Sequence, residues 1–437
     1  MSMAQAVLRR SPISVSHGRL LLRVAVVAAS LVALKSFVID PLSGHFTGTF
    51  EDFSAYFGAA RSIAAGGSPY AQFDPGTVVM SGLIYPPFAA VLLRPLALMT
   101  EHEALTVWLI GSLACTVAAA IIVARTALPA SWPRVELAVL AAVAFAPATY
   151  NYWHGQINPL IFLLLALAYR AYTRDREIVT GVLVGLAAGI KIAPVVVVLL
   201  LLRRHWWRGT AAVLTTGALT IVVALVALGA GATQTFLGSV FPALNRATGW
   251  IYDQSLGGTV SRLGEQSVLH VQPTSALVQV GSLIAGVAIL AVAAWSTRAG
   301  ARSPYERSAE FGLGVTAMVL AGAIAWFPHF TYLLIPLFAA CGLAASRGWR
   351  AERGLVLATA STIVVFGVVT PVAIAQLSID GIAAISQTSA WWPFLQLCSL
   401  PCITAAWFAV ALARSLRAQP ERITPRRLSR GAVAVPT

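Results

Sequence analysis

The sequence predicts an all-α protein with many membrane-spanning helices, and three observations support that prediction. Hydrophobic residues make up 58% of the 437 positions and charged residues only 11%, whereas a soluble globular chain is about 25% charged. The mean hydropathy is +0.79. Apolar stretches long enough to cross a bilayer as helices recur from end to end, without the alternating pattern of a membrane β-barrel.

The charge balance and the cysteines narrow the class further. A net charge of +14 is typical of a membrane protein whose cytoplasmic loops are rich in arginine, and we prefer this interpretation to nucleic-acid binding. The four cysteines lie in apolar segments and form no C-x-x-C pair, so the sequence predicts neither a disulfide framework nor a metal site. We expect no cofactor and leave any metal requirement open.

Ten apolar stretches are predicted to cross the membrane completely. They lie at about residues 24–38, 103–124, 135–152, 156–170, 209–229, 276–297, 309–327, 330–347, 354–376 and 391–413. The arginine clusters between them fall on one side if residues 81–99, which contain three prolines and an arginine, form an interfacial or re-entrant helix. Both termini are then cytoplasmic.

Residues 178–202 are long enough to cross once, yet three arginines precede this segment and three follow it. Positive charge on both flanks indicates that both ends are cytoplasmic. The sequence Gly189-Ile190-Lys191-Ile192-Ala193-Pro194 can turn the chain. We therefore predict a re-entrant hairpin of two short helices with Lys191 near its apex, which brings the total to about 12 helices.

The extracytoplasmic face is predicted to contain two long segments, residues 39–102 with juxtamembrane helices and residues 230–275. Residues 1–413 form one predicted domain, and the basic segment 414–437 a disordered cytoplasmic tail. Few cations remain on the outer face, and the commonest reason to keep a cation on the disfavoured side is to bind an anion. They are Arg61, Arg94, Arg246, Arg262 and, pointing towards that face, Lys191.

Polar motifs converge on this face, beginning with Asp52 and Tyr56. Their spacing places both side chains on one face of a helix that follows the first span. The alternative for Asp52 is a helix cap, because acidic residues are favoured in a first helical turn. Thr47 or Thr49 is able to take that capping role instead.

Two further motifs come from the middle of the chain. His154, Gln156 and Asn158 lie in "YWHGQINPL" at the outer end of a helical pair, either to bind a ligand or only to solvate the turn. Lys191 is costly in the bilayer unless it meets an anion or a water-filled cavity. We favour contact with an anionic ligand over a structural pair with a carboxylate.

The last motifs are "WIYDQSLGGTVSRL" and "WFPHFTY". Asp253 and Gln254 resemble groups that bind sugar hydroxyls, and Arg262 is a candidate phosphate ligand. His329 belongs either to the site or to the membrane interface. Together the motifs predict a cavity with carboxylates, amides, aromatic rings and cations, in which a base activates an acceptor hydroxyl and cations stabilise a departing phosphate. A lipid-linked sugar phosphate would reach such a site through the bilayer.

Five segments in this order resemble glycosyltransferase family 87: "DFSAYFGAARSIAAGGSPY", "YPPFAAVLLRPLA", "HGQINPLIFLLLALA", "GVLVGLAAGIKIAPVVVVLLLL" and "DQSLGGTVSRL". The resemblance implies the GT-C fold and an inverting, polyprenyl-phosphate-sugar-dependent transferase of the actinobacterial plasma membrane, with its active site outside. It implies that Asp52 is the catalytic acid/base position. It also suggests that His329 matches the second histidine of a family pair, whose first position here is Pro328, and Asp253 stands where the family often has asparagine.

From the resemblance we expect transfer of mannose from polyprenyl-phosphate mannose to a glycolipid or lipoglycan, such as a phosphatidylinositol mannoside or lipomannan. Lys191, Arg262 and His329 are assigned to the donor phosphate, and Tyr56, His154, Gln156, Asn158, Asp253 and Gln254 to sugars or acceptor. A polyprenyl-phosphate arabinofuranose donor is the close alternative. A transporter or flippase is a distant one, because the sequence shows no convincing inverted repeat. The expected partners are these lipids and the membrane, without nucleic acid.

Overall fold

The computed structural model describes residues 12–45, 48–74, 81–245, 248–250, 252–265, 275–297, 302–375 and 391–418, and it is built almost wholly of helices. The first half contains α1 (Pro12–Leu34), η2 (Lys35–Ile39), α2 (Asp40–Leu42), α3 (Glu51–Ala64), α4 (Pro87–Leu93), η3 (Arg94–Leu98), α5 (Glu101–Ala127), α6 (Arg134–Ala144), α7 (Ala146–His154), α8 (Asn158–Thr173), α9 (Glu177–Ile190), η4 (Ala193–Val197), α10 (Val198–Arg203) and α11 (Trp207–Leu228).

The second half contains α12 (Ala230–Thr235), η5 (Phe236–Val240), α13 (Phe241–Ala243), α14 (Leu256–Glu265), α15 (Ala276–Ser296), α16 (Pro304–Leu320), η6 (Phe327–Leu333), α17 (Leu334–Arg347), α18 (Arg353–Val364), η7 (Val365–Val369), α19 (Thr370–Ala375) and α21 (Trp391–Arg417). The last four residues of α21 belong to the segment predicted as a disordered tail. The rest of that tail, from residue 419, lies outside the described residues, as does Arg246.

The protein is a multi-pass membrane protein. Within the described ranges, seven helices are long and apolar enough to cross a bilayer, and an eighth span results if α6 and α7, bent by 50° at Phe145, count as one. Two of the ten predicted spans form the shorter helices α8 and α16, of 16 and 17 residues. The segment at 81–99 forms only the short α4 and η3, too short to span, in agreement with its interfacial prediction.

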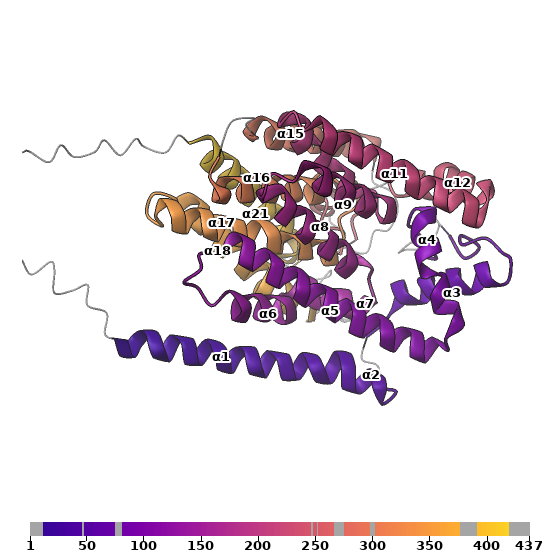
Figure 1. Cartoon of the computed structure of the whole chain (residues 1–437), viewed down its shortest axis with the longest axis horizontal. Helices are drawn as coiled ribbons and strands as arrows, with labels where there is room; N and C mark the ends of the chain where they lie inside the picture. The colour runs from indigo at the N-terminus through magenta and orange to yellow at the C-terminus, as the bar shows by residue number, and fades with distance from the viewer. Residues whose placement is uncertain are drawn as a thin grey trace, which may run out of the picture.

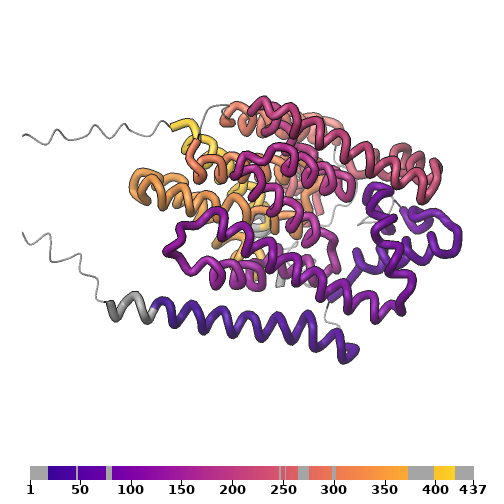
Figure 2. Tube along the Cα trace, viewed as in Figure 1, coloured from indigo at the N-terminus to yellow at the C-terminus, as the bar shows by residue number. Residues whose placement is uncertain are grey.

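The helices pack side by side as a bundle, with α1 lying along one side and α3, α4 and α12 gathered at one end (Figure 1). Helix α1 is largely uncovered, because only 6% of its most apolar window is buried. The start of α1 and the end of α21 lie at the opposite end from α3 (Figure 2). Both described ends of the chain are therefore on the same side of the bundle.

Helices α9 and α11 pack in direct backbone contact and run in the same direction. A side chain at Gly181 would meet the carbonyl of Gly209 at 2.1 Å, and one at Gly185 would lie 2.8 Å from the carbonyl of Val213. Small residues at every fourth position allow this close approach, as in other membrane helix pairs. Parallel packing requires the chain between the two helices to return to the end where α9 began.

The segment that runs back consists of η4 and α10, and it begins after Lys191. The helical conformation stops at Lys191, whose φ of −145° and ψ of 123° are extended. At the C-terminal end of this returning segment, the guanidinium group of Arg204 lies 3.4 Å from the carboxylate of Asp175, two residues before α9 begins. Arg204 also binds the buried Glu310 of α16 at 2.9 Å. The chain thus reverses direction after Lys191, between α9 and the segment formed by η4 and α10.

Candidate active site

The start of α3 is fixed by its contacts with the end of α7. The Phe50 amide donates to the carbonyl of Trp153 at 3.2 Å, and Phe50 precedes α3 in the left-handed region, with φ 49° and no side-chain cap bond. Thr49 meets His154 at 3.2 Å instead of capping the helix, and Thr47 lies outside the described residues. Asp52 lies in the first turn of α3, where an acidic side chain is favourable, but it is not the N-cap residue and no side-chain cap bond is found there.

The partner of the Asp52 carboxylate is Gln156, which Gly155 brings into reach. Gly155 ends α7 with φ 65°, a conformation that side chains other than glycine adopt with difficulty. A Cβ at this position would lie 2.6 Å from Cβ of Phe53 in α3, so the close approach of the two segments also requires glycine. The Gln156 Nε2 donates to Asp52 Oδ2 at 2.5 Å.

Two tyrosines fix the other end of the Gln156 amide. Tyr85 donates its hydroxyl to Gln156 Oε1 at 3.1 Å. Tyr56, one turn after Asp52 on the same helical face, donates to Tyr85 at 3.3 Å and accepts from the backbone amide of Ile157 at 3.3 Å. Tyr56 and Tyr85 are buried. Tyr56 thus supports the Gln156 amide from behind and does not line the cavity described below.

A second amide, Asn158, continues the network to Lys191. The Lys191 ammonium donates to Asn158 Oδ1 at 2.7 Å, and Tyr332 donates to the same oxygen at 2.8 Å. Lys191 Nζ also lies 2.8 Å from His329 Nε2. Because an ammonium group only donates, His329 Nε2 accepts and the ring proton is on Nδ1. Asn158 Nδ2 approaches Gln156 Oε1 at 3.3 Å, which joins the two halves.

An open cavity of about 1100 Å³ lies against this network at the α3 end of the bundle. Its wall contains the acids Glu51 and Asp52, the amides Gln72 and Gln156, and His154. Four large aromatic side chains complete the wall: Trp153, Trp250, Tyr252 and Trp326. A cavity that combines aromatic faces with amide and carboxylate groups suits a ligand with both apolar surfaces and hydroxyls.

The electrostatics of the cavity centre on Asp52. Burial raises the pKa of its carboxyl from the ordinary value of 3.8 to about 7, although the charge of Lys191 and the hydrogen bond from Gln156 both act to lower it. The neighbouring Glu51 is exposed. A carboxylate with a pKa near neutrality is suited to accept a proton at neutral pH.

Comparison with known proteins identifies the type of enzyme. The sequence profile of glycosyltransferase family 87 matches residues 83–322, more than half of the chain. The chain belongs to glycosyltransferase family 87. It is therefore a sugar-transferring membrane enzyme. The matched range contains Gln156, Asn158 and Lys191, whereas Asp52 and His329 lie outside it.

Three curated relatives are similar to this family 87 member. A "polyprenol-phosphate-mannose-dependent alpha-(1-2)-phosphatidylinositol pentamannoside mannosyltransferase" of Mycolicibacterium smegmatis is 27% identical over 66% of this chain and 68% of the relative. A protein of the same name from Mycobacterium tuberculosis is 28% identical over 66% of this chain and 65% of its own length. A third, a "phosphatidylinositol mannoside mannosyltransferase" of Mycobacterium tuberculosis, is 27% identical over 81% of both chains. No solved structure matches.

Three residues predicted for the site of this glycosyltransferase lie elsewhere. Arg262 is fully buried and donates to the backbone carbonyls of Trp250 at 2.8 Å and Asp253 at 2.6 Å. The Asp253 carboxylate accepts from the backbone amides of Thr248, Ser255 and Ala325. Gln254 is buried and donates to the carbonyl of Cys398. None of the three lines the cavity. Asn158, Lys191 and His329 do not line it either, but they are joined by hydrogen bonds to Gln156, which does, whereas Arg262, Asp253 and Gln254 lie outside that network.

Arg262, Asp253 and Gln254 stabilise the loop that contributes Trp250 and Tyr252 to the cavity wall. The backbone amide of Gln254 donates to the carbonyl of Ala325, and the backbone amide of Phe327 donates to the carbonyl of Tyr252. Together with Asp253 and Arg262 these bonds fasten the loop to the start of η6, beside Trp326. The loop's polar side chains thus position the cavity wall from behind and do not face a ligand.

The sequence interpretation missed three polar residues of the network. Tyr85 connects Tyr56 to Gln156, Tyr332 holds Asn158, and Asn151 accepts from Asn158 at 2.8 Å while donating to Thr331. Asn151 lies one helical turn before the Gly155–Asn158 segment, a spacing that points to it in retrospect. Among the described residues, no group of three His, Cys, Asp or Glu side chains is arranged to hold a metal ion.

Proposed function

We propose that this enzyme transfers mannose from polyprenyl-phosphate mannose to a hydroxyl of a membrane glycolipid, such as a phosphatidylinositol mannoside or lipomannan. The observation on which this rests is the half-buried Asp52 carboxylate, bound by Gln156 in the wall of an open aromatic cavity and coupled to the charge of Lys191. The printed names of the three relatives support the donor and the class of acceptor.

In this proposal Asp52 acts as the general base. It removes the proton of the acceptor hydroxyl while that oxygen attacks the anomeric carbon of mannose, so that the new bond forms on the face opposite the phosphate and the configuration inverts. The bond from the anomeric carbon to the phosphate oxygen breaks, and polyprenyl phosphate leaves with the electron pair. Lys191, held by Asn158 and His329, stabilises the charge that develops on this phosphate.

The cavity wall provides the remaining contacts. Gln156 orients the base, His154 and the aromatic rings contact the sugars, and no cofactor takes part. Asn158 acts by holding Lys191, and Tyr56 by holding Tyr85 and thereby Gln156. Specificity for mannose over arabinofuranose would arise from the shape of this wall.

We propose further that the cavity opens on the extracytoplasmic face of the plasma membrane. In this topology ten helices span the bilayer, residues 177–203 form the re-entrant hairpin, and both termini are cytoplasmic. The gathering of arginines at the end of the bundle opposite α3 supports this orientation, because cytoplasmic loops are enriched in arginine and lysine. A lipid-linked donor then enters from the bilayer, without a nucleotide.

The test compares Asp52→Asn with Glu51→Gln in purified enzyme. The two acids are adjacent and both line the cavity, but only Asp52 is bound by Gln156. We expect Asp52→Asn to fold normally and to lose transfer by a factor of ~10³ or more, while Glu51→Gln stays within about tenfold of the wild type. Wild-type turnover by Asp52→Asn would refute the assignment of the base.

The donor is tested in the same assay. Wild-type enzyme is incubated in parallel with labelled polyprenyl-phosphate mannose and labelled polyprenyl-phosphate arabinofuranose, each with a membrane lipid extract. Label in a glycolipid from the mannose donor alone is the expected result. Transfer from the arabinofuranose donor alone would overturn the choice of sugar but leave the role of Asp52 intact.

A further inference from the structure

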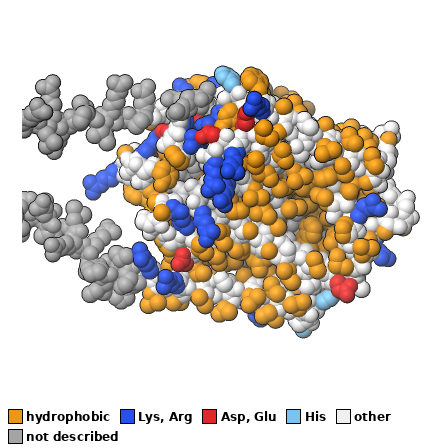
Figure 3. Space-filling view, in the orientation of Figure 1, with side chains coloured by type: hydrophobic (Ala, Val, Ile, Leu, Met, Phe, Trp, Pro, Cys, Tyr) orange, Lys and Arg blue, Asp and Glu red, His pale blue; other side chains and the backbone are white. Residues whose placement is uncertain are grey.

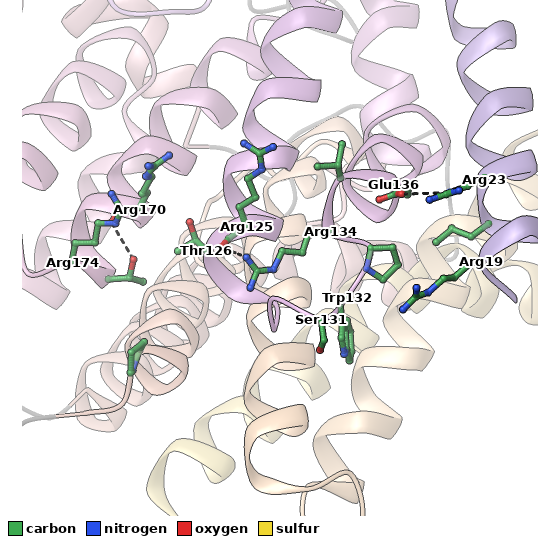
Figure 4. Close-up of a pocket in the computed structure, with 15 residues that line it drawn as sticks. Arg19, Arg23, Arg125, Thr126, Ser131, Trp132, Arg134, Glu136, Arg170 and Arg174 are labelled. Carbon is green, nitrogen blue, oxygen red and sulfur yellow. Dashed lines mark hydrogen bonds and ion pairs between the residues drawn. The ribbon is translucent and has the colours of Figure 1, made fainter. Parts of the chain in front are cut away.

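A second cavity lies at the end of the bundle opposite Asp52, between the start of α1, the α5–α6 connection and the end of α8. Its volume is about 810 Å³, within the range of ~300–1,000 Å³ typical of ligand sites. Six arginines contribute to its wall, and Figure 4 shows Arg125 and Arg134 in the middle, with Arg170 and Arg174 on one side and Arg19 and Arg23 on the other. We call this space the arginine cavity.

The arginine cavity has little negative charge of its own. Glu136 is its one acidic wall residue, and it lies 3.9 Å from Arg23. Within the described residues, no ion pair is found for the other five arginines. Acidic side chains on adjoining helices are already bound to arginines outside the cavity. These pairs are Asp175 with Arg204 and Arg307, and Glu310 with Arg204 and Arg302.

The cavity also has a fixed frame, which distinguishes it from scattered surface charge. Arg134 donates to the carbonyl of Pro129 at 2.8 Å and to that of Arg125 at 3.4 Å, which ties the α5–α6 connection together. Trp132 in the same connection stacks on Trp349 with ring centres 5.9 Å apart and planes 6° from parallel. These contacts fix the part of the wall that Arg134 and Trp132 form, while the guanidinium groups of the other five arginines are exposed and accessible to a ligand.

One side of the arginine cavity is formed by lipid-facing helix. Arg19, Leu22 and Arg23 of α1 line it, while their neighbours Leu21 and Val24 are 70% and 57% exposed. In the space-filling view, the basic side chains gather at this end and an apolar surface extends away from them (Figure 3). A ligand with a phosphate in the cavity and acyl chains along α1 would match both surfaces.

The length of the helical run that begins at the arginine cavity fits a bilayer. The helical run from Arg19 to Ile39 spans ~30 Å at 1.5 Å per residue, close to the thickness of the hydrocarbon core. The arginine cavity thus lies at headgroup depth on the side opposite Asp52. An inorganic anion would use only the charge, whereas a phospholipid would use the charge and the exposed apolar face of α1.

We propose that the arginine cavity is a binding site for the phosphate headgroup of one anionic phospholipid, whose acyl chains lie against α1. This site is separate from the one that contains Asp52 and does not depend on the reaction proposed there. Guanidinium groups bind phosphate oxygens through paired hydrogen bonds, and six of them line this wall.

The test measures lipid binding to the full chain in detergent by native mass spectrometry. Four probes are added separately: dioleoyl phosphatidylglycerol, dioleoyl phosphatidylcholine, glycerophosphoglycerol and inorganic phosphate. We expect one phosphatidylglycerol per chain, bound at least tenfold more tightly than each of the other three. Equal binding of phosphatidylcholine would overturn the preference for an anion. Equal binding of glycerophosphoglycerol or inorganic phosphate would overturn the choice of a lipid.

Matched variants locate the site. The triple variant Arg125→Gln, Arg170→Gln, Arg174→Gln should weaken phosphatidylglycerol binding at least tenfold. The control Arg350→Gln, Arg353→Gln, Arg414→Gln removes the same charge from residues outside the cavity and should bind within twofold of the wild type. An equal loss in both variants would show a diffuse charge effect, and retained binding in the first would place the lipid elsewhere. The comparison of the four probes, made on wild-type protein, holds even if a triple variant fails to fold.

Discussion

Replacing Gln156 by methionine should move the pH dependence of transfer without removing the base. Methionine has nearly the shape of glutamine but cannot donate the 2.5 Å hydrogen bond to Asp52. A hydrogen bond to a charged group contributes about 1.5–3 kcal/mol, and 1.36 kcal/mol corresponds to one pKa unit. Loss of this bond should therefore raise the pKa of Asp52 from about 7 to about 8–9.

The direction of the change in activity follows from the role of Asp52 as a base, which must be ionised to accept a proton. At pH 7 about half of the wild-type Asp52 carboxyls are ionised, against about 1–10% in the variant. Activity of Gln156→Met at pH 7 should fall about five- to fiftyfold and recover towards pH 9.5–10. The assay is kcat/KM for mannosyl transfer to a short soluble acceptor between pH 5 and 10, because this ratio reports the free enzyme.

The control is Gln72→Met, the same substitution at another amide of the cavity wall. It has no contact with Asp52 among the described side-chain hydrogen bonds, so the acid side of its pH profile should stay near pH 7. If Gln156→Met loses activity equally at every pH, Gln156 acts in substrate binding and the argument that it tunes the base is wrong.

Three further predictions concern stability and are tested by thermal unfolding in detergent. Arg262→Met leaves the buried carbonyl of Asp253 without its Arg262 donor and should cost about 1–3 kcal/mol, while the folded fraction keeps its transfer activity; wild-type stability combined with lost transfer would return Arg262 to the site. Gly185→Leu forces apart α9 and α11 and should lower the melting temperature strongly, whereas Gly281→Leu, with no atom within 4 Å of the added Cβ, should not. Because the pKa of Asp52 is raised on folding, its ionisation destabilises the protein, so Asp52→Asn should gain stability over the wild type from pH 4 to 7 and hold that gain above pH 7. A constant difference across this range would contradict the raised pKa.

The sequence predicted those site residues whose position follows from local spacing. Asp52 and Tyr56 are one helical turn apart, so they share a face wherever the helix lies. The break at Lys191 follows from the glycine and proline around it. Gln156 and Asn158 flank a turn whose glycine fixes the backbone. In each case the decisive geometry is set by a few neighbouring residues.

Local spacing could not predict the positions of Arg262, Asp253 and Gln254. A buried polar side chain looks the same in the sequence whether its partner is a substrate or a backbone group. Local turn chemistry gave one clue, since Asp253 accepts from Ser255 two residues on and Ser255 accepts from Gly258 three residues on. Such short-range bonds are typical of residues that build a loop. The partners at Ala325 and Cys398 depend on the tertiary fold, and no spacing reveals them.

The amides between Asp52 and Lys191 explain how one site keeps a base and a cation apart. A direct ion pair would lower the pKa of Asp52 and occupy both groups before a substrate arrived. Here Gln156 presents its Nε2 to the carboxylate, and Asn158 presents its Oδ1 to the ammonium. Tyr85 and Tyr332 donate to the amide oxygens and fix these orientations. Because amides do not titrate, the two charges remain separate, as the proposed mechanism requires of a base for the acceptor and a cation for the leaving phosphate.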